Sequence, residues 1–587
     1  MNEKEQYWKL IRNFTIIAHV DHGKSTLSDK FLDICKVKRN DDQQLDNLEI
    51  EKERGITIKA QTARLNYKYN NNDYILNLVD TPGHVDFSYE VIRYLEGCEN
   101  YILLVDAVQG VAAETLTKCR LAQKKNRFIL PVINKIDLPE ANIEKRLEEI
   151  DALGLDFTLT QQVSAKTGLG VQNLIEKIIE LGLYPTIEEV GKALIIDSWY
   201  DKYFGIVVIV RVFGGQFKKG MKLQTTSTNF ISGNVGVFTP SYEVRNDLKA
   251  GEIGFIITQI RVPKEIIIGD TISVVGTVVE PIKVPLAKPV VFCTFYNSET
   301  DLAIDALYKY QLNDSAFSFT IEQSELFGIY FNCGFLGLLH LEVVKERLKK
   351  EFDLDFMATL PSVQYKITLT SGEITMITDA SKWPANIQKI EEPEVFSTIF
   401  VHDMHIGKVS ELCMSLRAED LEIATGDQIS ITCRLPLGEI IVDFAKKLYA
   451  CTNGLVSFDY DVIGYRTSDL VRLLVIINDE VIEEFSMIVH TLKAKTIGGK
   501  LATKLKEIIP RSNILIKIKI SVNTPKNIIV GEEIRPYRKD VIAHCYGGDR
   551  SRKDKLLRQQ AKGKKHMMAH TKLNISSNAF IELMQLD

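Results

Sequence analysis

Ala18-His19-Val20-Asp21-His22-Gly23-Lys24-Ser25 lies between the apolar run Phe14-Thr15-Ile16-Ile17 and a polar-apolar run that begins at Thr26-Leu27. The pattern predicts a strand, a turn and the start of a helix. Backbone N–H groups in such a turn point at an anion, and the helix N-terminus adds partial positive charge. Lys24 would reach the outer phosphates of a bound nucleotide, and the Ser25 hydroxyl would ligate Mg²⁺. The stretch therefore predicts a phosphate-binding loop in an α/β domain.

This loop alone is an ambiguous signal, because Ala18 stands where such a loop usually begins with glycine. The alternative is a glycine-containing turn in an unrelated α/β domain. Four further segments follow in order within one domain-sized length, at residues 53–58, 80–84, 134–137 and 163–166. Together they favour a nucleotide-binding domain.

The first two segments suit the phosphate end of a nucleotide. Residues 41–59 are polar and show no helical or strand period, so they predict a mobile loop whose Thr57 closes over Mg²⁺ and the γ-phosphate. An apolar strand run then delivers Asp80-Thr81-Pro82-Gly83-His84 to its carboxyl end. There Asp80 would hold the Mg²⁺ shell, and the backbone of Gly83 would approach the γ-phosphate. His84 is next to the position of an attacking water.

The last two segments suit the base. Asn134-Lys135-Ile136-Asp137 follows another apolar run, and the Asp137 carboxylate can accept both N1–H and N2–H₂ of guanine, a pattern that adenine lacks. Val163-Ser164-Ala165-Lys166 supplies a backbone donor for the guanine carbonyl. The sequence therefore predicts GTP as the nucleotide.

Composition limits the class of protein. A chain of 587 residues is too long for one core, so about three to five domains are expected. Its nine cysteines form no C-x-x-C pair, which predicts neither disulfides nor a zinc site and suits a reducing cytosol. The charged N-terminus resembles no targeting peptide, and no apolar run approaches the length of a membrane span. A cytoplasmic protein is expected, and peripheral contact with the inner face of the cell membrane stays open.

Charge is concentrated near the C-terminus. Residues 535–572 contain twelve basic and three acidic residues in a chain whose net charge is −5. This asymmetry predicts an acidic body with one end that binds a polyanion. RNA is the expected polyanion, with a solvated helix as the alternative. The candidate RNA contacts are Arg550, Arg552, Lys553, Lys555, Arg558, Lys564 and Lys565.

Between these ends the pattern changes twice. After residue 185, short alternating runs and Gly-rich turns predict a β-barrel. Residues 290–369 then read strand, helix, strand, strand, helix, strand, with the last strand at 362–369, and a similar order recurs over residues 395–460. Two split βαβ modules are the simplest interpretation.

Residues 12–185 resemble the GTP-binding domain of translational GTPases, the class that includes elongation factors Tu and G, through segments 18–25, 54–58 and 80–84. The resemblance implies catalytic roles for Lys24, Thr57 and His84, with His84 orienting water. It implies Mg²⁺ ligation by Ser25, Thr57 and Asp80, and an apolar gate formed by Val20 and Ile56. No arginine finger is evident in this domain, so a slow intrinsic enzyme with an external activator is expected. The full predicted nucleotide-binding set is Asp21, His22, Gly23, Lys24, Ser25, Thr26, Asp80, Gly83, Asn134, Lys135, Asp137, Ser164, Ala165 and Lys166.

Segments 545–565 and 332–340 resemble the elongation factor 4 (LepA) family, and the similarity runs essentially from end to end. The resemblance implies a multidomain α/β and β fold: a P-loop GTPase domain (1–185), a β-barrel (186–283), two ferredoxin-like split βαβ modules (288–372 and 390–485) and a basic C-terminal domain (486–587). The chain departs from the family pattern at residues 405–407, 416–418 and 455–456, which concern the second module and not the GTPase residues.

The implied function is that of a ribosome-dependent GTPase in translation elongation, favouring back-translocation of tRNAs or rescue of stalled ribosomes. Its implied ligands are GTP, GDP and Mg²⁺, and its partners are the rRNA and tRNA of the ribosome, with no DNA. A monomer is expected. The alternative function is that of an assembly factor for the small ribosomal subunit, in which GTP times release.

Overall fold

The computed structural model describes most of the chain. The described residues are 7–19, 21–37, 49–54, 57–83, 85–111, 119–120, 122–125, 127–239, 241–282, 284, 288–324, 328–359, 361–424, 429–454, 456–537, 541–542 and 550–570. In these ranges, no helix combines the length and the apolar character needed to cross a membrane.

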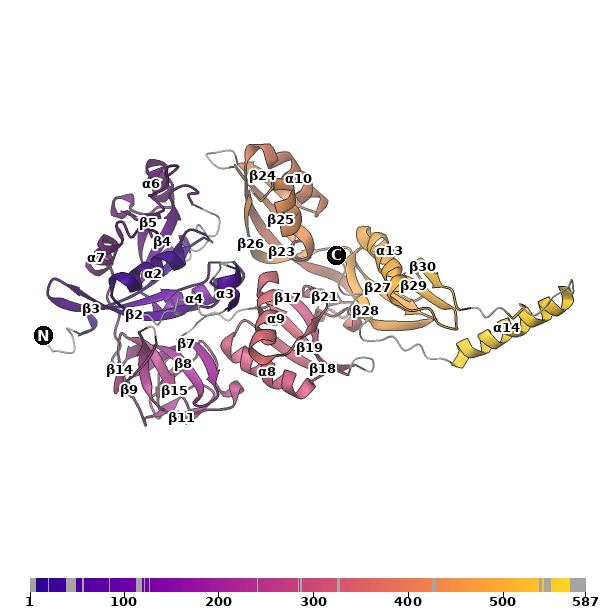
Figure 1. Ribbon diagram of the computed structural model, residues 1–587, viewed down its shortest axis with the longest axis horizontal. Coiled ribbons are helices and arrows are strands. Elements are labelled where there is room, and N and C mark those ends of the chain that lie inside the picture. Colours follow the sequence, from indigo (N-terminus) through magenta and orange to yellow (C-terminus); the bar gives the residue numbers. More distant parts are fainter. Residues whose placement is uncertain are drawn as a thin grey trace.

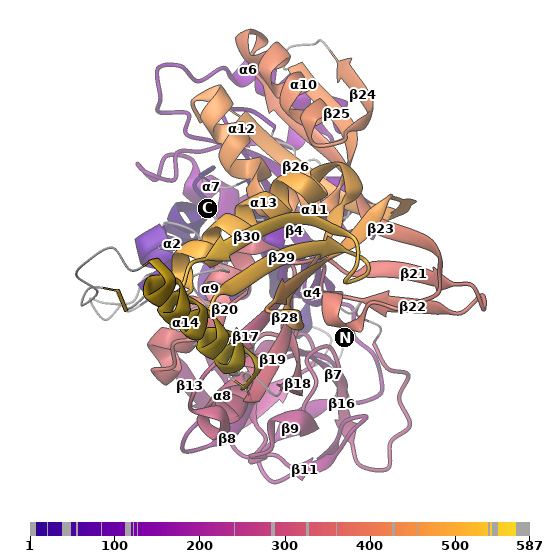
Figure 2. The same ribbon diagram turned by 90° about the vertical axis from the view of Figure 1, so that its right-hand side faces the viewer.

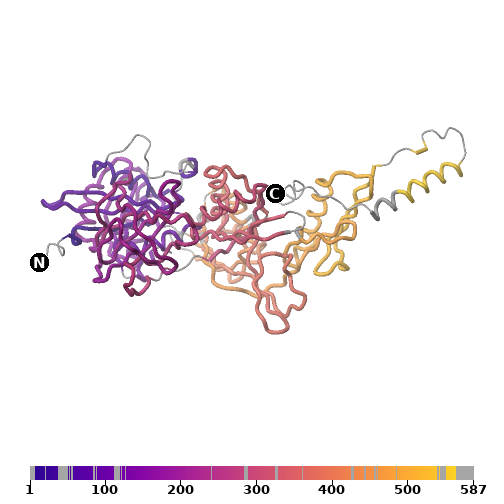
Figure 3. The backbone as a smooth tube through the Cα atoms, turned by 90° about the horizontal axis from the view of Figure 1, so that it is seen from below, coloured from indigo at the N-terminus to yellow at the C-terminus, as the bar shows by residue number. Residues whose placement is uncertain are grey.

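The chain forms an elongated series of units. Figure 1 shows the N-terminal sheet and the barrel together at one end, two α/β modules in the middle and the C-terminal sheet beyond them. Helix α14 (Arg550–His570) projects from the far end in Figures 1 and 3. Figure 2 looks along the molecule from that end, with α14 in front of the sheets. The predicted multidomain α/β and β fold class is confirmed.

The N-terminal domain is a six-stranded sheet covered by helices on both faces. The strand order is β2-β3-β1-β4-β5-β6, parallel except for the antiparallel edge strand β2. Side chains of β1 alternate between two cores, with Phe14 and Ile16 on one face and Ile17 on the other. The elements are β1 (Ile11–Ala18), α2 (Lys24–Ile34), α3 (Glu49–Arg54), β2 (Gln61–Tyr69), β3 (Asn72–Asp80), α4 (Ser88–Gly97), β4 (Asn100–Asp106), β5 (Phe128–Asn134), α6 (Ile143–Ala152), β6 (Gln161–Gln162) and α7 (Val171–Leu181).

The expectation of a mobile loop over residues 41–59 is wrong for part of that segment, because Glu49–Arg54 form helix α3. Ile50 on this helix is buried in a cluster with Ile58, Phe87 and Val343. A packing partner distant in the sequence therefore stabilises a helix that shows no local period.

The barrel joins an eight-stranded sheet, ordered β11-β10-β16-β7-β8-β15-β12-β13, to the pair β14-β9. It contacts the N-terminal domain through buried charges: Arg64 pairs with Glu252 at 2.5 Å and Arg211 with Glu99 at 2.8 Å. The strands are β7 (Lys192–Asp201), β8 (Gly205–Gly214), β9 (Gln216–Lys218), β10 (Lys222–Gln224), β11 (Asn229–Ile231), β12 (Val235–Phe238), β13 (Tyr242–Arg245), β14 (Asp247–Lys249), β15 (Ile253–Ile257) and β16 (Thr271–Val274).

The first α/β module has the antiparallel strand order β18-β19-β17-β20, as a split βαβ module requires. The prediction that residues 362–369 complete this sheet is wrong except at Ser362, which forms an isolated antiparallel bridge with Phe292 of β17. The short β20 takes that place, and β21 pairs instead with β22 and β23 of the next sheet. The elements are β17 (Val291–Tyr296), α8 (Thr300–Asn313), β18 (Ser318–Ser324), β19 (Gly328–Phe335), α9 (Leu338–Phe352) and β20 (Met357–Ala358).

The second α/β module is built on the long strand β23, which pairs with β25 and β26 and, at its start, with β21. Strand β24 at the sheet edge is absent from the sequence prediction. Its side chains are mostly exposed and acidic, so they carry little apolar signal. The elements are β21 (Tyr365–Leu369), β22 (Ile374–Ile377), β23 (Ile387–Val401), α10 (Ile406–Ser415), β24 (Glu419–Ala424), β25 (Ile429–Pro436), α11 (Leu437–Glu439), a π-helical turn (Ile440–Phe444), α12 (Ala445–Thr452) and β26 (Val456–Thr467).

The C-terminal sheet has the order β28-β27-β29-β30, with helix α13 packed on one face. It starts at Leu470, so the predicted boundary at 485/486 is wrong. Strand β27 lies before that boundary and strand β28 crosses it, yet they pair with each other, and β27 also pairs with β29 of this sheet. The elements are β27 (Leu470–Ile477), β28 (Glu480–His490), α13 (Thr491–Ile508), β29 (Ile516–Val522) and β30 (Ile528–Ile534).

Candidate nucleotide-binding site

The phosphate-binding loop lies at the carboxyl end of β1, where the chain turns into α2. Asp21 and Gly23 adopt left-handed backbone angles, with φ of 64° and 90°. Gly23 is the N-cap of α2, whose first residue is Lys24. A β-carbon on Gly23 would lie 2.5 Å from Nδ2 of Asn134, so both the backbone angle and the space require glycine here.

The side chain of Lys24 is buried and points across the loop to the end of β3. Its ammonium group donates to the carbonyl oxygen of Thr81 and lies 3.3 Å from Oδ1 of Asp80. The two residues predicted to serve the phosphates and the metal are therefore in contact. A phosphate group is a chemically suitable alternative partner for the same ammonium group.

Ser25 and Thr57 meet although 32 positions separate them: their hydroxyl oxygens are 3.0 Å apart. Thr57 is buried, and the backbone after it is fixed because the Glu51 carboxylate accepts N–H bonds from Ile58 and Lys59, each 2.9 Å long. Hydroxyl and carboxylate oxygens are ligands that Mg²⁺ prefers. The donor set thus fits Mg²⁺, with Asp80 as the nearby carboxylate.

The Asn134 side chain joins the phosphate-binding loop to the predicted guanine loop. Its Nδ2 donates to the carbonyl oxygen of His22 at 2.8 Å, and its Oδ1 accepts the N–H of Ala165 at 2.9 Å. Asn134 is only 1% exposed, so both backbone groups depend on this amide. Ser164 shapes the same loop by accepting the N–H of Thr167 at 3.1 Å.

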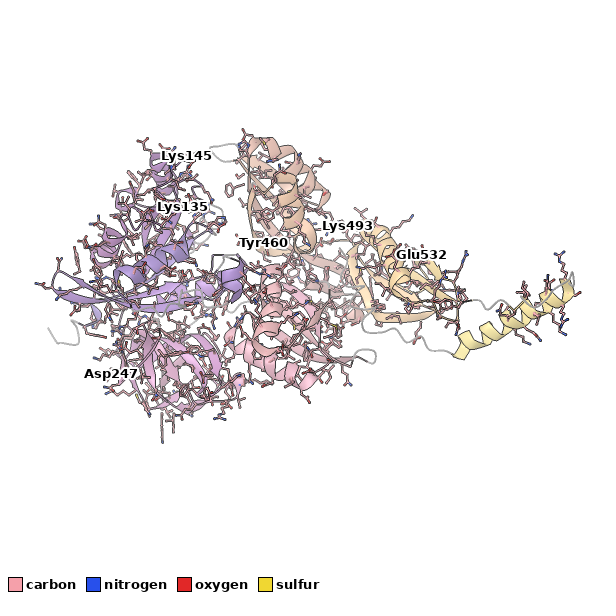
Figure 4. All side chains as sticks on the ribbon, in the orientation of Figure 1. Lys135, Lys145, Asp247, Tyr460, Lys493 and Glu532 are labelled. Atoms are coloured by element: carbon pink, nitrogen blue, oxygen red, sulfur yellow. The ribbon has the colours of Figure 1, made fainter. Side chains whose placement is uncertain are left out.

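Lys135 and Asp106 border this region. Lys135 has a φ of 63°, and its ammonium group lies 2.7 Å from the Asp106 carboxylate. Burial raises the pKa of Asp106, but hydrogen bonds from Lys135 and from the N–H groups of Val108 and Gln109 outweigh it and lower the pKa. Figure 4 shows Lys135 on the side of the N-terminal domain that faces the second α/β module.

His22 is buried inside the loop, and its Nδ1 lies 3.3 Å from the carbonyl oxygen of Leu104. Burial, with a smaller effect of His19, lowers the His22 pKa to about 4. The ring is therefore neutral at physiological pH, and its Nδ1–H donates to that carbonyl.

The other predicted site residues divide into two groups. Asp21, Thr26, Asp137 and Lys166 are exposed and Gly83 is buried. The catalytic candidate His84 and the gate candidates Val20 and Ile56 lie outside the described residues. Glu51 and Asp106 support the site but are missing from the sequence prediction. Glu51 lies in a polar segment, where a buried acid has no local sequence signal. Asp106 ends the apolar run of β4, and this is the same kind of signal that predicted Asp80.

The predicted RNA contacts of the tail lie on α14, the helix that projects at the far end of the molecule in Figure 4. Arg550, Arg552, Lys555 and Arg558 are exposed and Lys553 is half-buried. The side chains of Lys564 and Lys565, and segment 543–549 of the tail motif, lie outside the described part.

Comparison with known proteins identifies three family regions. The "Elongation factor Tu GTP binding domain" matches residues 9–182, the "Elongation factor G C-terminus" residues 389–474 and the "GTP-binding protein LepA C-terminus" residues 477–585. A solved structure from Thermus thermophilus superposes with a TM-score of 0.58 over 78% of this chain and 97% of its own. At 16% identity it supports the fold alone.

Full-length relatives share far more of the sequence. Elongation factor 4 of Microcystis aeruginosa is 43% identical, and that of Picosynechococcus sp. 44%, each over 98% of both chains. Elongation factor 4 of Alkaliphilus oremlandii is 44% identical over 99% of both. The chain therefore belongs to the elongation factor 4 family of translational GTPases.

Proposed function

We propose that this chain is a ribosome-dependent GTPase that acts during translation elongation. The observation that carries the proposal is the meeting of Ser25 with Thr57 beside the Lys24–Asp80 pair. Four residues from three separate segments converge where the phosphate-binding loop ends, as hydrolysis of a nucleotide triphosphate requires. Among the relatives named above, all are called elongation factors, which favours elongation over assembly of the small subunit.

Each residue then has a distinct role. Lys24 exchanges Asp80 for the phosphates of GTP, while Ser25 and Thr57 hold Mg²⁺ near Asp80. The ion supplies positive charge where the phosphates gain negative charge. Gly83 contacts the γ-phosphate and His84 orients water, with Val20 and Ile56 as its gate. Asp137 reads the guanine base, while Asp21, His22, Gly23, Thr26, Asn134, Lys135, Ser164, Ala165 and Lys166 complete the nucleotide site.

In the proposal, helix α14 is a clamp on ribosomal RNA. Exposed Arg and Lys side chains on a helix that projects from the body suit phosphate contacts along an RNA backbone. Because the proposed protein acts on ribosomes, the proposal also includes that it acts in the cytoplasm, as a monomer that binds near the tRNA sites. Back-translocation of tRNAs or rescue of stalled ribosomes is the proposed outcome of GTP hydrolysis.

Deletion of residues 549–572 tests the clamp. We expect GDP affinity to stay within about twofold and ribosome-stimulated GTP turnover to fall at least about tenfold, since the nucleotide site is distant and the basic residues supply ribosome affinity. Charge reversal of Lys145 to Glu, on helix α6 of the N-terminal domain, is the control for a general loss of positive charge. Undiminished stimulation of the truncated chain would refute the clamp.

A depletion experiment separates elongation from assembly. The proposal predicts slowed or stalled elongation with a normal profile of small subunits. Accumulation of 30S precursors with normal elongation rates would overturn it in favour of the assembly function.

A further inference from the structure

A carboxylate of the N-terminal domain caps a helix of the first α/β module. Oδ2 of Asp86 accepts the N–H of Leu339 at 2.9 Å and that of His340 at 3.3 Å. These groups belong to the first turn of α9, whose N–H groups have no partner within the helix. Asp86 is 6% exposed, so the interaction is largely shielded from water. The negative charge also suits the positive end of the helix dipole.

Gly337 makes this contact possible. It occupies the N-cap position of α9 and has no side chain with which to cap the helix. A β-carbon on Gly337 would lie 2.2 Å from the Asp86 carboxyl group. Its φ of −170° is extended backbone, so the approach of Asp86, and not backbone strain, requires glycine. The contact with Asp86 thereby explains why Gly337, one of the two glycines in segment 332–340, is a glycine.

Helix α3, which precedes Thr57, contacts the same helix. Arg54 pairs with Glu342 at 2.9 Å and with Glu346 at 3.2 Å, and Lys350 pairs with Glu53 at 2.9 Å. These pairs are partly exposed and are therefore weak. The buried Asp86 cap, which serves two N–H groups, is the stronger of the two connections.

Asp86 lies close in the sequence to the segment that is assigned to the γ-phosphate. Asp86 follows Gly83 by three residues and His84 by two, so it lies at most about 11 Å along the chain from the segment assigned to the γ-phosphate. We propose that Asp86 is a positioning residue that links this segment to α9. Displacement of the first α/β module then moves the catalytic segment, and nucleotide binding acts on α9 by the same linkage. The kinetic consequence rests on the proposed function, whereas the linkage itself does not.

Amide hydrogen exchange on the full chain tests the linkage without ribosomes. The amides of Leu339 and His340 are measured with GDP and with a non-hydrolysable GTP analogue. In the parent we expect the protection of these amides to differ between the two nucleotides. In Asp86→Ala this difference should vanish, and exchange should be about 2-fold to 30-fold faster, the range that corresponds to a lost N-cap. Asn142→Ala is the matched control, because Asn142 caps α6 through the N–H of Lys145, within its own domain.

Two results of this experiment would overturn the proposal: equal protection with both nucleotides in the parent, or unchanged exchange in Asp86→Ala. Gly337→Ala gives a second test that leaves the carboxylate in place and should reproduce the faster exchange. Gly499→Ala is its control, since a β-carbon there meets no atom within 4 Å.

Steady-state kinetics adds the functional readout. With 70S ribosomes, Asp86→Ala and Gly337→Ala should lower kcat at least about tenfold, with the KM for GTP within about twofold, and Asp86→Asn should recover part of the loss. A kcat of the Asp86→Ala variant equal to that of the parent would overturn the positioning role. A parent chain that ribosomes fail to stimulate would refute the proposed function, and the exchange result would still decide on the linkage.

Discussion

Replacing Asn134 with Ala should detach the phosphate-binding loop from the guanine loop. The change removes the donor to the His22 carbonyl and the acceptor for the Ala165 N–H, both buried. Each buried backbone group left without a partner costs about 1–3 kcal/mol, which gives about 2–6 kcal/mol for two.

The assay compares this variant with a matched control. Asn100 is also a buried asparagine that bonds backbone groups, those of Asn13 and Leu183, but it lies at the opposite end of the parallel strands. In denaturant unfolding, both Asn→Ala variants should lose similar stability. Titration with GDP should separate them.

For Asn134→Ala the Kd for GDP should rise about 30-fold or more, because binding must restore an arrangement that costs at least about 2 kcal/mol. For Asn100→Ala the Kd should change less than about threefold. Equal GDP affinity in the two variants, at equal loss of stability, would refute the joining role of Asn134.

Three further perturbations test the phosphate-binding loop and the contact between the N-terminal domain and the barrel. Gly23→Ala should weaken GDP binding at least about tenfold in the same titration, since φ is 90° and the added carbon meets the Asn134 amide; parent affinity would contradict this. Glu252→Ala should cost about 3–5 kcal/mol in urea unfolding, because it leaves the buried Arg64 unpaired, and a loss below about 1 kcal/mol would be inconsistent with that pair. The pKa of His22 is about 4 in the folded chain and 6.5 as the ordinary value, so unfolded chains take up the proton first as pH falls. Up to about 3 kcal/mol of stability should therefore be lost between about pH 6.5 and 4, and His22→Asn should flatten that part of the pH profile.

The phosphate-binding loop is predictable from sequence because its determinants are local. Gly23 supplies the left-handed turn, and the apolar run before it supplies a buried strand, so residues 14–25 predict the loop itself, while the four later segments identify the nucleotide-binding domain. The same holds for the strand that presents Asp80. The contact between Ser25 and Thr57 is predictable only from the resemblance to a family, because no local sequence pattern indicates that the segment of Thr57 packs against the phosphate-binding loop.

The errors in the fold have one physical cause. Strand β21 is predictable as a strand, but its partners β22 and β23 are fixed by packing between distant segments. Strand β24 forms because it pairs with β25, although its exposed acidic side chains disfavour a strand. Helix α3 forms because Ile50 packs against another domain.

The cap of α9 by Asp86 could not be predicted from the sequence, again because the contact joins distant segments. A capping residue is normally sought next to the helix that it serves. Asp86 caps α9 from 253 positions away, and the only local trace is Gly337, a glycine where a capping side chain is expected. Such contacts become visible only when both domains are placed together.

Steady-state GTP turnover by the full chain, with and without 70S ribosomes, tests the central claim most directly. We predict that ribosomes raise turnover at least about a hundredfold, as expected of an enzyme in whose GTP-binding domain the sequence shows no evident arginine finger. His84→Ala should remove most of this increase and leave GDP affinity within about twofold, because its assigned role is confined to the transition state. Turnover that is the same with and without ribosomes would contradict the account.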